Sequence, residues 1–148
     1  ELLVRALGYQ QRIWAENIRE ELSHHDGLME QLDRLFDLLD RIIQSVKKEA
    51  LEEICNIFFL SPVFKRDKDC GLAELLYDMV GEAKRGGMLR EEFPDEYIVL
   101  SLSGKLFSYI SFSIAEKDGM ERTCTSGRIR AYLADSFAQE FLAEQRKI

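Results

Sequence analysis

The chain has 148 residues and a formal net charge of −7, and 46% of its residues are hydrophobic while 32% are charged. This length suits one domain with a hydrophobic core, and this composition is that of a folded globular protein rather than a disordered chain. A surface of this sign repels nucleic-acid phosphates unless its cations cluster, and here they alternate with acids along the chain. We therefore expect a single domain over residues 1–148 that does not itself bind DNA.

Neither a membrane nor an oxidising compartment is indicated. The longest apolar run, Ile57–Leu60, is far shorter than the ~18 residues of a membrane-spanning helix, and the N-terminus has no basic-then-apolar signal. Cys55, Cys70 and Cys124 are odd in number and widely separated, which is typical of reduced thiols. These features predict a cytoplasmic protein without a membrane partner.

Apolar residues recur at helical spacing from the start of the chain. The first stripe predicts a helix from Glu1 to about Leu22. Because this helix opens inside its apolar period without an N-cap, we expect the natural chain to begin further upstream. A second helix begins at Leu28, and Asp26 is its expected N-cap.

The apolar pattern then continues to Leu60 without proline or glycine. One helix over that span would be ~50 Å long, which a domain of this size does not easily hold. We therefore predict a break around Ser45 to Lys48, followed by a third helix that Pro62 ends.

A fourth helix is predicted from about Leu72 to Ala83, and Gly86-Gly87 can supply the left-handed conformation that ends a helix. The fifth helix is expected to begin at Pro94, since a proline in the first turn leaves no amide unpaired. A sixth helix is expected from about Ser126 to Glu144.

The fifth and sixth helices carry apolar residues on two sides. On the fifth helix, one side holds Tyr97, Leu100, Gly104, Phe107, Ser108 and Ser111, and another holds Ile98, Leu102, Leu106, Tyr109 and Ile110. A chain this small offers one core, so the second face favours coverage by a second subunit. The predicted dimer interface consists of Leu100, Gly104, Ser108, Ser111, Leu133 and Phe137; the alternative is packing of these residues within one chain.

Three segments resemble the C-terminal part of TetR-family transcriptional regulators: the opening ELLVRAL, the turn GGMLREEFPDEYIVLSLSGKLF and the final helix RIRAYLADSFAQEFL. The resemblance implies an all-α fold of about six helices, in which the last two form a four-helix bundle with those of a second copy. It implies an effector-sensing and dimerisation domain of a repressor. The family's helix-turn-helix head is absent, so DNA would be bound only through an N-terminal head that this chain lacks.

A small hydrophobic or aromatic effector is the expected ligand, because the resemblance places a pocket among the first five helices. The candidate pocket residues are Gln10, Trp14, Asn17, Phe36, Phe59, Tyr77 and Phe107. Aromatic residues at helical spacing are also ordinary core residues, so plain packing is the alternative for each. Arg12, Lys105 and Arg130 could reach inwards on their flexible side chains.

No catalytic or metal site is predicted, and no cofactor. The two histidines, His24 and His25, are adjacent in a turn, so neither offers metal-ligand spacing or a base for a nucleophilic cysteine. The same argument weighs against a ferritin-like enzyme, which needs Glu-x-x-His ligands. Two hypotheses remain: a ligand-responsive regulator, and a helical protein-interaction module without a cavity.

Overall fold

The computed structural model describes residues 16–23, 27–52, 71–117 and 125–143. Its regular secondary structure is helical: α2 spans Leu28–Ser45, α4 spans Gly71–Arg85, α5 spans Asp95–Lys117 and α6 spans Ser126–Phe141. Residues 16–22 and 48–52 are also helical. The predicted all-α class is confirmed.

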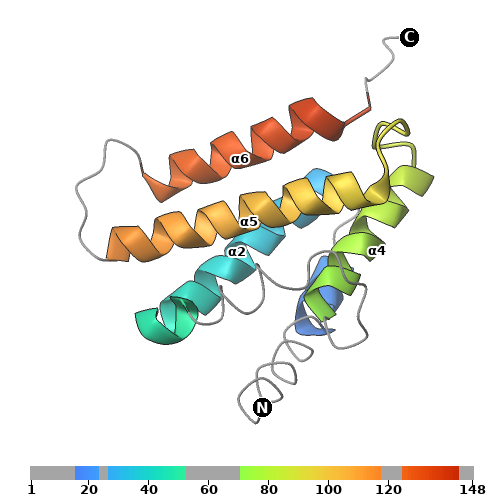
Figure 1. Ribbon diagram of the computed structural model, residues 1–148. Helices are drawn as coiled ribbons and strands as arrows, with labels where there is room; N and C mark the ends of the chain where they lie inside the picture. The colour runs from blue at the N-terminus through green and yellow to red at the C-terminus, as the bar shows by residue number, and fades with distance from the viewer. Residues whose placement is uncertain (1–15, 24–26, 53–70, 118–124, 144–148) are drawn as a thin grey trace.

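The helices form two layers (Figure 1). α5 and α6 lie side by side, while α2 crosses behind α5 and α4 meets the end of α5 where that helix begins. α5 contacts α2, α4 and α6, and α2 also contacts α6. α5 is therefore the central element around which the other helices pack.

The core lies between these two layers. Its largest fully buried side chains are Phe36, Phe137, Leu32, Leu35, Leu51, Leu89, Ile98, Leu102, Leu106, Val80 and Val99. They come from α2, α4, α5 and α6 and from the segments next to them, so burial of these apolar surfaces holds the helices together.

The predicted break after α2 is confirmed. Val46 has an extended backbone, with φ −113° and ψ 141°, and the chain is helical again from residue 48. The start of α2 differs from the prediction: its N-cap is Gly27, which has no side chain to bond the free amides, whereas Asp26 lies outside the described residues. Glycine is tolerated at an N-cap because this position is non-helical.

The predicted glycine end of α4 is confirmed. Gly87 has a φ of +72°, a conformation that a side chain disfavours. The amide of Gly87 donates to Lys84 O at 3.0 Å and the amide of Met88 donates to Ala83 O at 2.9 Å. This paired pattern satisfies the last carbonyls of the helix and turns the chain towards α5.

The sixth helix ends at Phe141, three residues earlier than the predicted Glu144. Beyond it, Leu89 and Leu142 form an antiparallel bridge, with Arg90 N donating to Phe141 O at 2.8 Å and Ala143 N donating to Met88 O at 2.9 Å. The sequence pattern missed this end because the stop is a contact with a segment about fifty residues away.

Among the residues described, one helix is long and apolar enough, by those two measures alone, to cross a membrane. It covers Asp95–Glu116 in α5, with a mean hydropathy of 1.5, and half of it is buried inside the protein. This helix contains no long uninterrupted apolar run in the sequence, because serines interrupt the apolar residues of α5. Burial against α2, α4 and α6 is also what the core helix of a folded domain shows.

Candidate functional site

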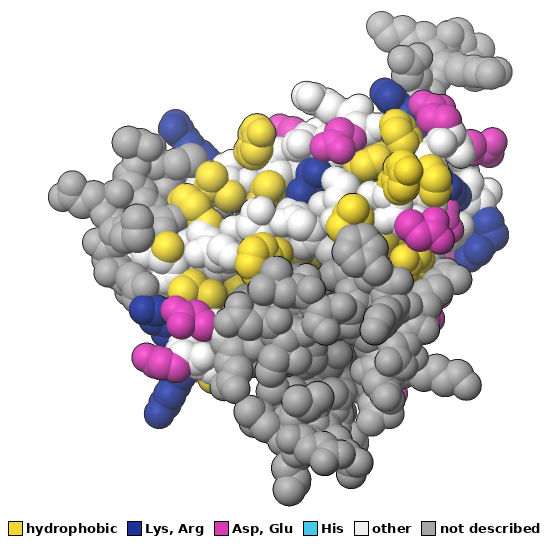
Figure 2. Space-filling model, viewed as in Figure 1, with side chains coloured by type: hydrophobic (Ala, Val, Ile, Leu, Met, Phe, Trp, Pro, Cys, Tyr) yellow, Lys and Arg dark blue, Asp and Glu magenta, His cyan; other side chains and the backbone are white. Residues whose placement is uncertain are grey.

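The side of α5 that faces away from the core is apolar and uncovered. Tyr97 is 62% exposed and Leu100 is 44% exposed, and Gly104 and Ser108 are exposed one and two turns further on. At 100° per residue these four positions share one stripe, which we call the exposed face of α5. Figure 2 shows hydrophobic side chains along α5 and α6 on the viewed face, among polar atoms.

Tyr132 adds a large exposed ring on α6, at 68% exposure. The opposite side of α5 behaves as predicted: Ile98, Leu102 and Leu106 are at most 1% exposed. The two-sided character inferred from the sequence is therefore present, with one side buried and the other open.

In the part of the chain that the structure describes, no contact at Gly104 requires a glycine. A Cβ built at this position meets nothing within 4 Å, and the backbone conformation is helical. Glycine inside a helix costs about 0.5–1 kcal/mol relative to alanine. This loss has no compensating contact among the described residues.

The other predicted interface residues divide between surface and core. Ser111 is partly buried on α5. Leu133 is 8% exposed and Phe137 is 0% exposed, and both belong to the core of the single chain. Both side chains face the helices against which α6 packs, so a second copy could contact them only if α6 turned away from α5 and α2, and neither belongs to the proposed interface. Their apolar stripe is occupied by intramolecular packing.

The predicted pocket residues do not line a common cavity in the described parts of the chain. Phe36 and Tyr77 are 1% and 4% exposed in the core, and Phe107 packs against that core while partly buried. Asn17 is exposed. Three further candidates, Gln10, Trp14 and Phe59, lie outside the described residues.

The described residues do form two open clefts, and neither of these is lined by a predicted pocket residue. The first, of about 190 Å³, is lined by Arg19, Leu22, Ser23, Gln31, Leu75, Asp78, Met79, Glu82 and Arg85. The second, of about 240 Å³, is lined by Asp40, Ile43, Gln44, Ser113, Glu116 and Ser126. Most of the lining residues are polar or charged, although apolar atoms form about half of the wall of the first cleft and more than half of that of the second.

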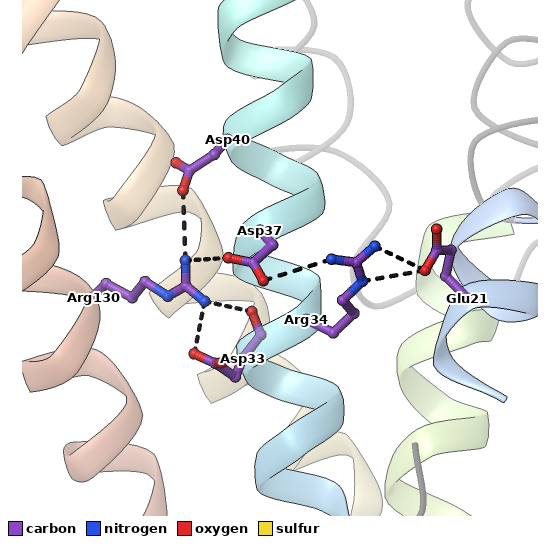
Figure 3. A network of polar contacts seen from close by, with 6 residues as sticks. All are labelled: Glu21, Asp33, Arg34, Asp37, Asp40 and Arg130. Atoms are coloured by element: carbon purple, nitrogen blue, oxygen red, sulfur yellow. Dashed lines mark hydrogen bonds and ion pairs between the residues drawn. The ribbon is translucent and has the colours of Figure 1, made fainter. Parts of the chain in front are cut away.

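A charged network joins α6 to α2 (Figure 3). Arg130 donates through Nη1 to Asp37 Oδ1 at 2.7 Å, and through Nη2 to both Asp33 Oδ1 and Asp33 O at 2.6 Å. Asp40 Oδ2 lies 3.5 Å from Nη1, and the guanidinium carbon lies 5.5 Å from the centre of the Phe36 ring. Arg130 is thus held by three carboxylates and an aromatic ring.

Burial would by itself lower the pKa of Arg130. Its hydrogen bonds with Asp37 and Asp33 outweigh that effect and raise the pKa above the ordinary value. The guanidinium therefore stays charged at any pH at which the protein is folded. The Arg130 side chain reaches inwards, as predicted to be possible, but it meets the carboxylates of Asp33 and Asp37 rather than a pocket.

Sequence reasoning missed the acidic side of this network, although a signal was present. Asp33, Asp37 and Asp40 are separated by steps of four and three residues, which places them on one face of α2. Their partner is about ninety residues further on, so no local pattern could reveal that an arginine covers them.

Tyr109 extends the network from α5, because its hydroxyl donates to Asp40 Oδ1 and its ring meets that of Phe36 edge-on at 5.0 Å. Burial, and then the hydrogen bond to the Asp40 carboxylate, raise the pKa of Tyr109 well above its ordinary value of 10.0. The folded protein therefore retains the phenolic proton at a pH where the unfolded chain loses it.

Replacing Tyr109 with phenylalanine is expected to flatten the alkaline loss of stability. At about pH 8 the variant loses the bond to Asp40, which contributes about 1–2 kcal/mol. Above about pH 10 the unfolded wild-type chain gives up a proton that the folded protein keeps, so the wild type loses stability as the pH rises. Urea unfolding of both proteins at about pH 8 and about pH 11 measures this; an unchanged difference between them would contradict the assignment.

The described residues contain no group of three or more His, Cys, Asp or Glu side chains placed to hold a metal ion. His24 and His25 and all three cysteines lie outside them. Comparison of the sequence and structure with models of protein families, with curated proteins and with solved structures gave no match in any of the three.

Proposed function

We propose that this chain is the effector-sensing and dimerisation domain of a cytoplasmic transcriptional regulator of the TetR kind, a repressor that a small hydrophobic or aromatic ligand releases from DNA. DNA would be bound through an N-terminal head that is not part of this sequence. The chain would act as a homodimer, without catalytic activity or a cofactor.

The exposed face of α5 carries this proposal. It exposes two large hydrophobic side chains, Tyr97 and Leu100, next to one another, and such a group on a folded domain suggests a contact with another molecule. The glycine at its centre lets a second backbone approach closely, and no contact within the described chain explains it. The same face on a second copy would cover the exposed apolar side chains and approach closely at Gly104. Two such faces pair in a two-fold arrangement, the commonest symmetry of soluble oligomers.

Replacing Gly104 with alanine tests the dimer through two effects of opposite sign. Because the added methyl group meets nothing within the chain, the free energy of unfolding of the monomer should rise by about 0.5–1 kcal/mol. The methyl group would also separate two copies at their closest approach, so dimer dissociation should become easier by about tenfold, or ~1.4 kcal/mol. Sedimentation equilibrium and urea unfolding measure the two effects.

Gly81→Ala is the matched control, since Gly81 is helical but lies on α4, and its nearest neighbour is the flexible end of Arg85 at 3.4 Å. It should change unfolding without changing dissociation. A protein that stays monomeric at every concentration would contradict the proposed dimer. If that monomer also binds lipid vesicles in a flotation experiment, the exposed face of α5 would be a membrane contact instead.

A helical protein-interaction module is the second candidate, because the described clefts are open and contain none of the predicted pocket residues. A ligand that binds only the folded state separates the two candidates. At a hundredfold excess over its dissociation constant it adds about 2.7 kcal/mol, which raises the melting temperature by about 5–10 °C for a chain of this size. A broad panel of small apolar compounds that never moves the melting temperature would favour the interaction module.

A further inference from the structure

Four charged side chains connect three helical segments in one continuous series. Glu21, in the helix of residues 16–22, accepts hydrogen bonds from Nε and Nη2 of Arg34 on α2 at 3.2 and 2.9 Å. Arg34 Nη1 lies 3.7 Å from Asp37 Oδ2, while Asp37 Oδ1 accepts from Arg130 of α6 at 2.7 Å. Figure 3 shows the series, which we call the relay: Glu21, Arg34, Asp37 and Arg130.

Asp37 is the junction of the relay, because each of its carboxylate oxygens faces a different arginine. One rotation of this side chain changes both distances at once. The two arginines are 22% and 19% exposed and Asp37 is 44% exposed, so solvent screens these charges in part, though less than at an open surface. A change at Arg34 therefore alters the energy of the bond to Arg130, although the two arginines belong to different helices.

Arg130 helps to orient α6 on α2, together with the buried Leu133 and Phe137 of the same helix. Its guanidinium is bound on one side of the helix by Asp33 and Asp37. Tyr132 follows two residues later, about 200° around the helix, and is exposed on the other side. If Arg130 lost its contacts with Asp33 and Asp37, the side of α6 that carries Tyr132 would shift. This helix lies beside α5.

We propose that the relay couples the helix of residues 16–22 to α6, so that displacement of the first is felt at the second. The coupling acts through two arrangements of the Asp37 side chain. In one, Asp37 contacts both Arg34 and Arg130; in the other, it no longer contacts Arg34. Its regulatory meaning rests on the proposed function: a shift of the first helix on effector binding would reach the pair of helices next to the dimer face.

Hydrogen exchange of the α6 amides, followed by mass spectrometry on the full chain, tests the coupling. Glu21→Gln removes the charge that holds Arg34 and does not touch α6. We expect α6 amides to exchange about threefold to tenfold faster, as mutations within a coupled network do. Arg19→Gln is the matched control, since it breaks an exposed pair with Asp78 of α4 at 3.1 Å from the same helical segment.

A second pair of variants distinguishes a relay from general loosening. In an Asp37→Asn background the junction is absent, so Glu21→Gln should add no further exchange in α6. Three outcomes would each overturn the relay. Glu21→Gln could have no effect on α6, or an effect equal to that of Arg19→Gln. Its effect could also add to that of Asp37→Asn. Sedimentation run in parallel separates these outcomes from failure of the dimer, because exchange in a monomer still measures the coupling.

Discussion

Replacing Phe137 with alanine is expected to lower the free energy of unfolding by about 3–5 kcal/mol. Phe137 is 0% exposed at the centre of α6, and its ring lies 5.4 Å from that of Phe141. Truncation removes buried apolar surface and leaves a cavity that the surrounding helices cannot fill completely. For a protein of ordinary stability this loss is a large part of the total.

Urea unfolding measures the effect, with Gln139→Ala as the control because Gln139 is exposed on the same helix. The control should change stability by less than about 0.5 kcal/mol. An effect of Phe137→Ala no larger than that of the control would contradict the placement of this ring in the core of the single chain.

Replacing Arg130 with methionine is expected to lower the free energy of unfolding by about 1–3 kcal/mol. Methionine keeps part of the apolar stem but provides no donor, so Asp33 and Asp37 lose their shared partner and repel one another along α2. The loss stays below that of a fully buried ion pair because the carboxylates are 72% and 44% exposed. Added salt should reduce the difference, since screening weakens both the attraction and the repulsion.

Arg128→Met is the matched control, because Arg128 is an exposed arginine two residues away on α6. Its loss should be within about 0.5 kcal/mol of zero. Arg130→Lys adds a second comparison: a lysine keeps the charge but cannot donate to Asp33 and Asp37 from the two sides of a planar group. Full stability of Arg130→Lys would show that charge alone, and not the geometry of the guanidinium, holds α6 to α2.

Local patterns predicted the end of α4, but not the residue that caps the start of α2. Gly86-Gly87 ended α4 as expected, because only a residue without a side chain takes a positive φ at no cost. The break near Ser45 followed from the length that a small domain can hold. The end of α6 at Phe141 did not follow, because Arg90 and the bridge between Leu89 and Leu142 arrive from another part of the chain.

Periodicity showed that α5 is apolar on two sides, but it could not assign the partner of each side. Ile98 and Leu102 became core because α2, α4 and α6 cover them, whereas Tyr97 and Leu100 were left exposed. For Leu133 and Phe137 the same pattern led to the prediction of a dimer interface, but both side chains are buried within the single chain. An apolar stripe on a helix indicates that this face is buried, but it does not indicate which molecule covers the face.

By itself the sequence determined the all-α class, the two-sided α5 and the end of α4 at Gly86-Gly87, because these depend on backbone conformation and on spacing along one helix. Only the tertiary structure decided that Arg130 binds the aspartates of α2, that Asp37 is shared by two arginines, and which apolar face stays open. Those features depend on the approach of residues up to about ninety positions apart, and packing in three dimensions alone selects such pairs.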